Sequence, residues 1–129
     1  MAEKLMRILY IEDEPDIQEV ARLALEMVGG FTVEVCSSGA DALEKAPLFK
    51  PQLILSDVMM PGMDGATTLK KLRELAQTEK TPAIFMTAKV QQGEIEQYRE
   101  MGAVDVIAKP FDPMTLASKV EEIWERCSG

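Results

Sequence analysis

Polar residues that could do chemistry follow four separate apolar runs of the chain. Glu12 and Asp13 come directly after the first run, and Asp57 comes directly after the third. Thr87 follows the fourth run, and Lys109 ends the fifth. In an open parallel α/β sheet the carboxyl ends of the strands line one edge, where ligands bind. The order of residues therefore predicts that three carboxylates, a hydroxyl and an amine meet at one place.

This set of groups favours phosphoryl chemistry. Crowded carboxylates repel one another, and their hard oxygen atoms suit Mg²⁺, with Mn²⁺ as the alternative. A divalent cation beside Asp57 would neutralise the charge of an incoming phosphoryl group, so Asp57 is a credible nucleophile that forms an acyl phosphate. Lys109 could then pair with the phosphoryl group as a point charge, while Thr87 donates a hydrogen bond to it.

The elements that must position these residues alternate along the whole chain. Short runs rich in Ile, Leu and Val are typical of strands buried on both faces of a parallel sheet. Stretches of helical periodicity separate them, which predicts an α/β doubly wound sheet. We place the strands at 5–11, 32–36, 52–56, 83–86 and 104–108.

Five helices are expected between and after these strands. The later ones are placed at 39–48, 66–76, 92–101 and 113–126, and we interpret Trp124 in the last as a packing residue. The first helix ends at Gly29, and its inward stripe is expected to contain Ile17, Val20, Ala21, Ala24 and Val28. The Lys109–Pro110 bond is a candidate cis peptide, which would fix the direction of the lysine side chain.

Composition excludes several function classes. The chain has 129 residues and a formal net charge of -8, which argues against binding to nucleic acid or to anionic membranes. It contains no histidine, so it has neither a Ser-His-Asp triad nor a phosphohistidine of its own. Cys36 and Cys127 are too few for a disulfide framework, and Cys36 is interpreted as a buried hydrophobic residue. No apolar run reaches the ~20 residues that span a bilayer. We expect one cytoplasmic domain over 1–129 without an output domain.

Nearly the whole chain resembles the receiver domain of bacterial response regulators. The resemblance rests on an ordered set of motifs rather than on any single residue. The matching pieces are Ile11-Glu12-Asp13-Glu14, Asp57-Val58-Met59-Met60-Pro61-Gly62-Met63-Asp64-Gly65, Met86-Thr87-Ala88 and Lys109-Pro110-Phe111.

The resemblance implies a fold and a mechanism. The fold would be flavodoxin-like, a five-stranded sheet of order 2-1-3-4-5 between two layers of helices; this order comes from the family and not from the spacing. Asp57 would accept a phosphoryl group from a phosphohistidine of a sensor histidine kinase or a histidine phosphotransfer protein. Asp13, Asp57 and the Met59 main-chain carbonyl would bind Mg²⁺ directly, with Glu12 acting through water. Thr87 and Lys109 would sense the phosphoryl group.

The resemblance also implies the consequences of phosphorylation. The protein would be a switch in a two-component phosphorelay, not an enzyme for external substrates, although it would catalyse its own phosphoryl uptake and autodephosphorylation. Downstream protein targets would bind the 92–126 surface. The chain would be a monomer or a phosphorylation-dependent dimer.

Three positions modify this expectation. The family usually has Tyr or Phe three residues before the lysine, and here the position is Val106. Signalling is therefore expected to depend on shifts of loops and helices rather than on rotation of an aromatic ring. Met59 and Lys89 occupy the positions at which the family tunes the lifetime of the phosphate. We expect Met59 to hinder the attacking water and Lys89 to compete for phosphoryl oxygens.

Other interpretations of the same residues differ in what they require. Taken singly, Glu12, Asp57, Thr87 and Lys109 could be helix-end, loop or turn residues, and it is their joint placement that argues otherwise. A phosphatase with an aspartate nucleophile commonly has a second Asp where this chain has Met59. A flavin carrier would need a phosphate-cradling loop after the first strand, where this chain has acids. A degenerate receiver used as a scaffold would lack the complete set.

Overall fold

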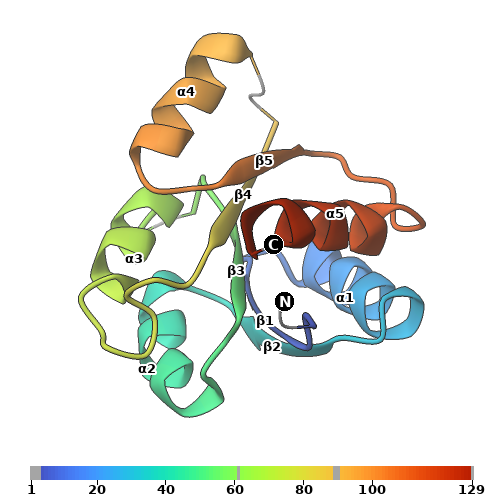
Figure 1. Ribbon diagram of the computed structural model, residues 1–129, viewed down its shortest axis with the longest axis horizontal. Helices are drawn as coiled ribbons and strands as arrows, with labels where there is room; N and C mark the ends of the chain where they lie inside the picture. Colours follow the sequence, from blue (N-terminus) through green and yellow to red (C-terminus); the bar gives the residue numbers. More distant parts are fainter. Residues whose placement is uncertain (1–3, 61, 89–90, 129) are drawn as a thin grey trace.

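Five parallel strands form one sheet in the computed structural model of the chain. The structure describes residues 4–60, 62–88 and 91–128. The strand order is β2-β1-β3-β4-β5, as expected from the family resemblance (Figure 1). The strands are β1 (Arg7–Ile11), β2 (Thr32–Cys36), β3 (Leu53–Asp57), β4 (Ala83–Thr87) and β5 (Asp105–Ala108).

Helices cover both faces of the sheet. Figure 1 shows α1 and α5 on one side and α2, α3 and α4 on the other. The predicted three-layer architecture is therefore confirmed. The helices are α1 (Pro15–Leu23), continued by the π-helical segment η1 (Ala24–Val28), α2 (Gly39–Phe49), α3 (Gly65–Leu72), α4 (Gln92–Glu100) and α5 (Leu116–Ser128).

The strands divide into buried and half-buried ones. All five residues of β3 and of β4 are buried, as the apolar runs predict. The two edge strands differ, because β2 has only Cys36 fully buried and β5 only Ile107. The prediction that every strand is buried on both faces is thus wrong for β2 and β5. These two strands lie at the edges of the sheet, where each has a neighbouring strand on one side only.

The inward stripe of the first helix is partly wrong. Ala21, Ala24 and Leu25 are buried, but Val20 is 44% exposed and Val28 is 51% exposed. The inward arc is centred on Ala21 and Leu25, so Val20 lies beyond its edge. A π-helical turn contains more residues than an α-helical one. The segment η1 therefore turns Val28 outward.

Two later helices are shorter than predicted. The helix α3 ends at Leu72 instead of 76 because Arg73 holds the following turn: its guanidinium donates to the carbonyl of Thr78 (3.1 Å) and to that of Thr81. The last helix begins at Leu116, after a turn. Its Trp124 is 7% exposed and packs in the core, as interpreted from the sequence.

Cys36 is fully buried, and burial raises the pKa of its thiol to about 12, which agrees with its interpretation as an inert core residue. Lys89 lies outside the described residues. Within those residues no helix combines the length and the apolarity needed to span a membrane.

Candidate phosphoacceptor site

Four strand ends deliver the predicted residues to the carboxyl edge of the sheet. Glu12 follows β1, Asp57 ends β3, Thr87 ends β4 and Lys109 follows β5. Main-chain hydrogen bonds extend the sheet to this edge: the Glu12 amide donates to the Cys36 carbonyl at 3.0 Å, and the Lys109 amide donates to the Thr87 carbonyl at 2.9 Å. Sheet pairing therefore sets the position of each functional residue.

Three carboxylates form an acidic cluster at this edge. Glu12, Asp13 and Asp57 each place one carboxylate oxygen within 4.8 Å of the other two. Glu12 is fully buried, Asp57 is 5% exposed and Asp13 is half-buried. Like charges this close need a cation, which the sequence analysis predicted from the same residues.

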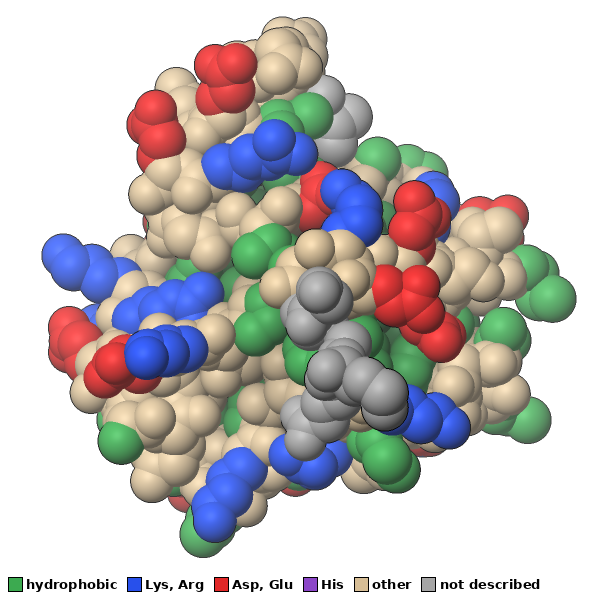
Figure 2. Space-filling view, in the orientation of Figure 1, with side chains coloured by type: hydrophobic (Ala, Val, Ile, Leu, Met, Phe, Trp, Pro, Cys, Tyr) green, Lys and Arg blue, Asp and Glu red, His purple; other side chains and the backbone are tan. Residues whose placement is uncertain are grey.

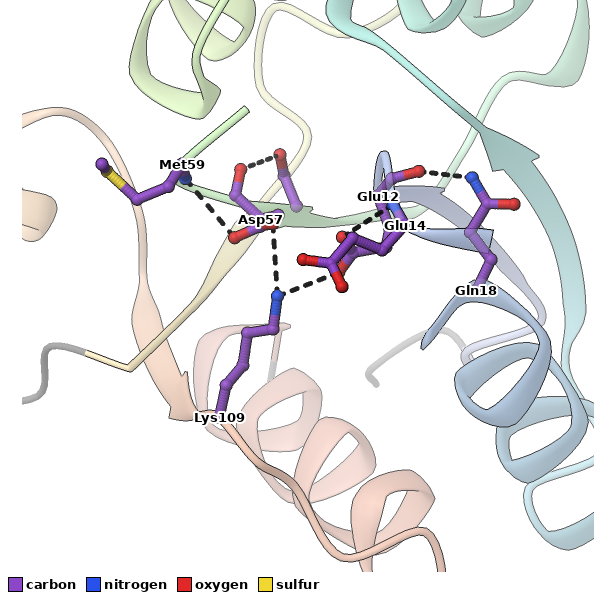
Figure 3. Close-up of polar contacts among 7 residues, drawn as sticks. Glu12, Glu14, Gln18, Asp57, Met59 and Lys109 are labelled. Carbon is purple, nitrogen blue, oxygen red and sulfur yellow. Dashed lines mark hydrogen bonds and ion pairs between the residues drawn. The ribbon is translucent and has the colours of Figure 1, made fainter. Parts of the chain in front are cut away.

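Lys109 reaches into the acidic cluster from the end of β5. Its Nζ lies 3.1 Å from Glu12 Oε1 and 3.2 Å from Asp57 Oδ2, so that it bridges two of the three acids (Figure 3). Its own peptide bond to Pro110 is cis. Burial opposes the charge of Lys109, but the hydrogen bond to Glu12 and the charges of Glu12 and Asp57 raise its pKa overall.

Burial acts against the charge of Glu12. It raises the pKa of Glu12 to about 7, and the charge of Asp57 adds to this rise, while the hydrogen bond from Lys109 lowers the pKa in part. Lys109 supplies one positive charge to a cluster of three carboxylates, so the ionised cluster keeps a net negative charge. Oxygen donors at this spacing with a net negative charge fit a divalent cation such as Mg²⁺.

The segment after Asp57 is shaped by Asp64 and Gly65. The Asp64 carboxylate accepts a hydrogen bond from the Thr67 amide at 2.8 Å and caps α3. A Cβ on Gly65 would lie 2.3 Å from the carbonyl oxygen of Asp57, so only glycine lets α3 start this close to the site. The turn residues predicted from the sequence thus fix where α3 begins.

Gln18 is a supporting residue that the sequence analysis missed. Its side-chain amide donates to the main-chain carbonyl of Glu12 (Figure 3). The same amide donates to Ser37 Oγ at 3.1 Å. It thereby ties α1 to the end of β1 and to the chain after β2. Contacts over such separations leave no local pattern in the sequence.

The comparison with protein families decides the identity of this arrangement. The sequence model described as the response regulator receiver domain matches residues 8–121, which include the acidic cluster, Thr87 and Lys109. The chain belongs to the response regulator receiver family. It is therefore a receiver domain of two-component signalling, a signalling protein of a class that interacts with histidine kinases and downstream effectors.

Three relatives illustrate the match. Response regulator Rre1 of Synechocystis is 35% identical over 126 residues, covering 98% of this chain and 54% of that protein. The chain spans about half the length of the first curated relatives it matches. The chemotaxis protein CheY4 of Vibrio cholerae superposes with a TM-score of 0.85 at 28% identity, over 92% of this chain and 98% of that one.

The third relative carries a metal. The receiver domain of the Pseudomonas aeruginosa sensor histidine kinase PA1611 has a TM-score of 0.79 at 29% identity, over 95% of this chain and 96% of that one. That structure has a magnesium ion coordinated in its active-site cleft. Receiver domains bind Mg²⁺ at an acidic pocket, and this receiver has such a cluster in Glu12, Asp13 and Asp57.

The remaining predicted positions lie around the cluster of this receiver. Thr87 is 2% exposed at the end of β4. The Met59 amide donates to Asp57 Oδ1 at 3.4 Å, whereas the Met59 side chain is 66% exposed and points away from Asp57 in Figure 3. Val106 is half-buried and pairs with Phe85 of β4 in the sheet register. How Val106 affects switching stays a prediction.

Proposed function

We propose that Asp57 accepts a phosphoryl group from a phosphohistidine of a partner protein in an Mg²⁺-dependent reaction. The observation that carries this proposal is the bridging of Glu12 and Asp57 by Lys109 inside a cluster of three carboxylates. These 129 residues contain no histidine, so the donor imidazole must lie outside them. A sensor histidine kinase or a histidine phosphotransfer protein has the required chemistry.

Asp57, Lys109 and Thr87 have different roles in the proposed transfer. A carboxylate oxygen of Asp57 attacks phosphorus, an O–P bond forms, and the P–N bond to the imidazole of the donor breaks. Lys109 already lies at Asp57 Oδ2, so a small movement lets it pair with a phosphoryl oxygen. Thr87 donates a hydrogen bond to another phosphoryl oxygen. The buried position of Asp57 limits access of water to the acyl phosphate.

The metal would be held at the acidic edge of the site. Asp13, Asp57 and the main-chain carbonyl of Met59 would bind it directly and Glu12 through water, with Mn²⁺ able to replace Mg²⁺. When bound, the cation supplies neutralisation of the charge on the transferring phosphoryl group.

Phosphorylation is proposed to change which partner the domain binds. It adds about -1.5 to -2 charges, which Lys109, Thr87 and the cation must meet. The resulting shifts of loops would alter the 92–126 surface, to which a downstream protein target binds. The domain would act in the cytoplasm as a monomer or as a phosphorylation-dependent dimer, and it would dephosphorylate itself.

Intact-mass spectrometry tests the phosphoacceptor. The protein is incubated with acetyl phosphate and Mg²⁺, and we expect a mass increase of one phosphoryl group that is lost in Asp57→Asn. The matched control is Glu14→Gln, which removes an exposed acid beside the cluster and should leave the labelling unchanged. Equal labelling of wild type and Asp57→Asn would refute the proposal.

A further inference from the structure

A hollow of about 490 Å³ opens at the amino edge of the sheet, opposite the phosphoacceptor site. It lies between the starts of β1 and β3 and the loop that leads into β4. Trp124 of α5 is one of its lining residues. This volume falls within the range of sites for small molecules. We call it the amino-edge hollow; its polar lining includes Arg7, Lys50, Gln52, Glu79, Lys80 and Thr81.

The amino-edge hollow has an excess of positive charge in an acidic protein. Three of its lining residues are cations, Arg7, Lys50 and Lys80, and one is an acid, Glu79. Within the described part of the chain none of these three cations forms an ion pair. The same is true of Lys4, Lys70, Lys71, Arg73 and Lys119, whereas Arg22, Lys45, Arg99, Lys109 and Arg126 are paired. What sets Arg7, Lys50 and Lys80 apart is that they converge on one hollow beside a single acid, in a chain with a formal net charge of -8.

A helix end accounts for only one of the three cations of the hollow. Lys50 follows the last residue of α2, where a cation is stabilised by the helix dipole. Arg7 begins a strand and Lys80 lies in a loop, so neither has this stabilisation. Figure 2 shows Lys and Arg side chains gathered over the lower left of the molecule, where Figure 1 places α2, α3 and the loop after α3.

Hydrogen bonds preform the walls of the hollow. The buried Gln52 accepts from the amides of Met6 at 2.7 Å and Arg7 at 2.9 Å, and donates to the carbonyl of Lys4 at 3.0 Å, which joins the starts of β1 and β3. Arg7 Nε donates to the Lys50 carbonyl at 2.9 Å. The loop wall is held by the hydrogen bonds of Arg73 to the carbonyls of Thr78 and Thr81.

We propose that the amino-edge hollow binds a small anion that carries two or more phosphate groups. Arg7 uses Nε to hold the wall, so its two terminal nitrogens stay available for phosphate oxygens, which arginine binds in a bidentate manner. Lys50 and Lys80 add two point charges on the other sides. Because the hollow is at the opposite edge of the sheet from Asp57, the anion and the phosphoryl group can be bound at the same time.

Fluorescence of Trp124, the only tryptophan of the chain, reports binding directly. Inorganic tripolyphosphate is titrated into the full chain at low salt, and we expect a saturable signal that weakens as salt is added. The variants Lys50→Gly and Lys80→Gln should each weaken binding by roughly tenfold, as for a charge-assisted contact. Glycine suits the positive φ of 53° at Lys50, so the first variant should fold.

Two controls separate a site from general attraction. Lys119→Gln removes an exposed cation of α5 that does not line the hollow and should bind tripolyphosphate like the wild type. Asp57→Asn should also bind it unchanged, so that the result is independent of the proposed phosphorylation. Equal weakening by all three lysine variants, or no saturable signal at millimolar tripolyphosphate, would overturn the inference. Citrate in place of tripolyphosphate tests whether carboxylates suffice; tighter binding of citrate would also overturn it.

Discussion

The two edges of the sheet carry opposite charges for different structural reasons. At the carboxyl edge, Glu12, Asp13 and Asp57 crowd within 4.8 Å and share one lysine. At the amino edge, Arg7, Lys50 and Lys80 line a hollow without ion pairs in the described residues. The acids sit on strand ends that the sheet fixes, whereas two of these cations sit in connecting segments. The position of a charge at a strand end is thus fixed by sheet pairing, whereas the position of a charge in a connecting segment is not.

The largest contrast between the edges should appear in metal affinity. Asp13→Asn removes one carboxylate of the acidic cluster, and we expect Mg²⁺ to bind at least about tenfold more weakly, with slower labelling by acetyl phosphate. Lys80→Gln, at the other edge, should change neither property. Calorimetric titration of Mg²⁺ measures both variants. Similar losses in the two variants would show that overall charge, rather than the cluster, sets the affinity.

Gly65 tests whether the carboxyl edge needs its close backbone approach. In Gly65→Ala the added Cβ would lie 2.3 Å from the Asp57 carbonyl oxygen, so α3 must shift. We expect the free energy of unfolding to fall by about 1–3 kcal/mol, together with slower labelling of Asp57. Gly93→Ala is the matched control, because its Cβ meets no atom within 4 Å. Urea denaturation measures the free energy of unfolding of both variants. An equal, small decrease in the two would contradict the role of Gly65.

The buried acid Glu12 should make the carboxyl edge sensitive to pH. Its pKa in the folded protein is raised from 4.5 to about 7. A raised pKa stabilises the fold fully below about pH 4.5, and this contribution is lost as pH rises through about 7. In the absence of metal, Glu12→Gln should therefore flatten the pH dependence of unfolding over this window. If the free energy of unfolding of Glu12→Gln depends on pH as that of the wild type does, Glu12 is not the cause of this pH dependence.

The same proton should compete with Mg²⁺. Below pH 7 the affinity for Mg²⁺ is expected to fall, by up to about tenfold per pH unit, because Glu12 must lose its proton to act as a ligand group. Calorimetric titrations at several pH values measure this slope. The Glu12→Gln variant should show a shallower one.

The smallest effect is expected at Met59. Its amide donates to Asp57 Oδ1, its side chain is exposed, and we expect that side chain to hinder the attacking water. We expect Met59→Asn to change the dephosphorylation rate several-fold. Met114→Asn changes a methionine of similar exposure, 72%, in the loop before α5 and should have no effect. The decay of phosphorylated protein after removal of acetyl phosphate gives both rates, and an unaltered decay in Met59→Asn would discard the tuning role.

Much of the fold could be predicted because buried parallel strands leave a plain sequence pattern. The runs around Leu55 and Phe85 are largely apolar, so β3 and β4 and their order along the chain were predictable to within about one residue. The buried faces and the ends of the helices were harder to predict from the sequence. The outward turn of Val28 depends on a π-helical segment, and the early end of α3 depends on hydrogen bonds from Arg73 to a later turn.

The candidate site shows the same division. Glu12, Asp13, Asp57 and Lys109 could be predicted to meet, because strand ends of a parallel sheet share an edge. The support by Gln18 could not, since it acts across separate elements. The amino-edge hollow was also missed, because Arg7, Lys50 and Lys80 come from three segments with no common motif.

Mapping the acyl phosphate by peptide mass spectrometry, with and without Mg²⁺, tests the central claim most directly. The gathered acids should make the carboxylate of Asp57 reactive only when a divalent cation is bound. We predict one phosphoryl group, on Asp57 alone, in the presence of Mg²⁺ and none after chelation of the metal. Labelling that persists without metal, or that maps to another residue, would contradict the account.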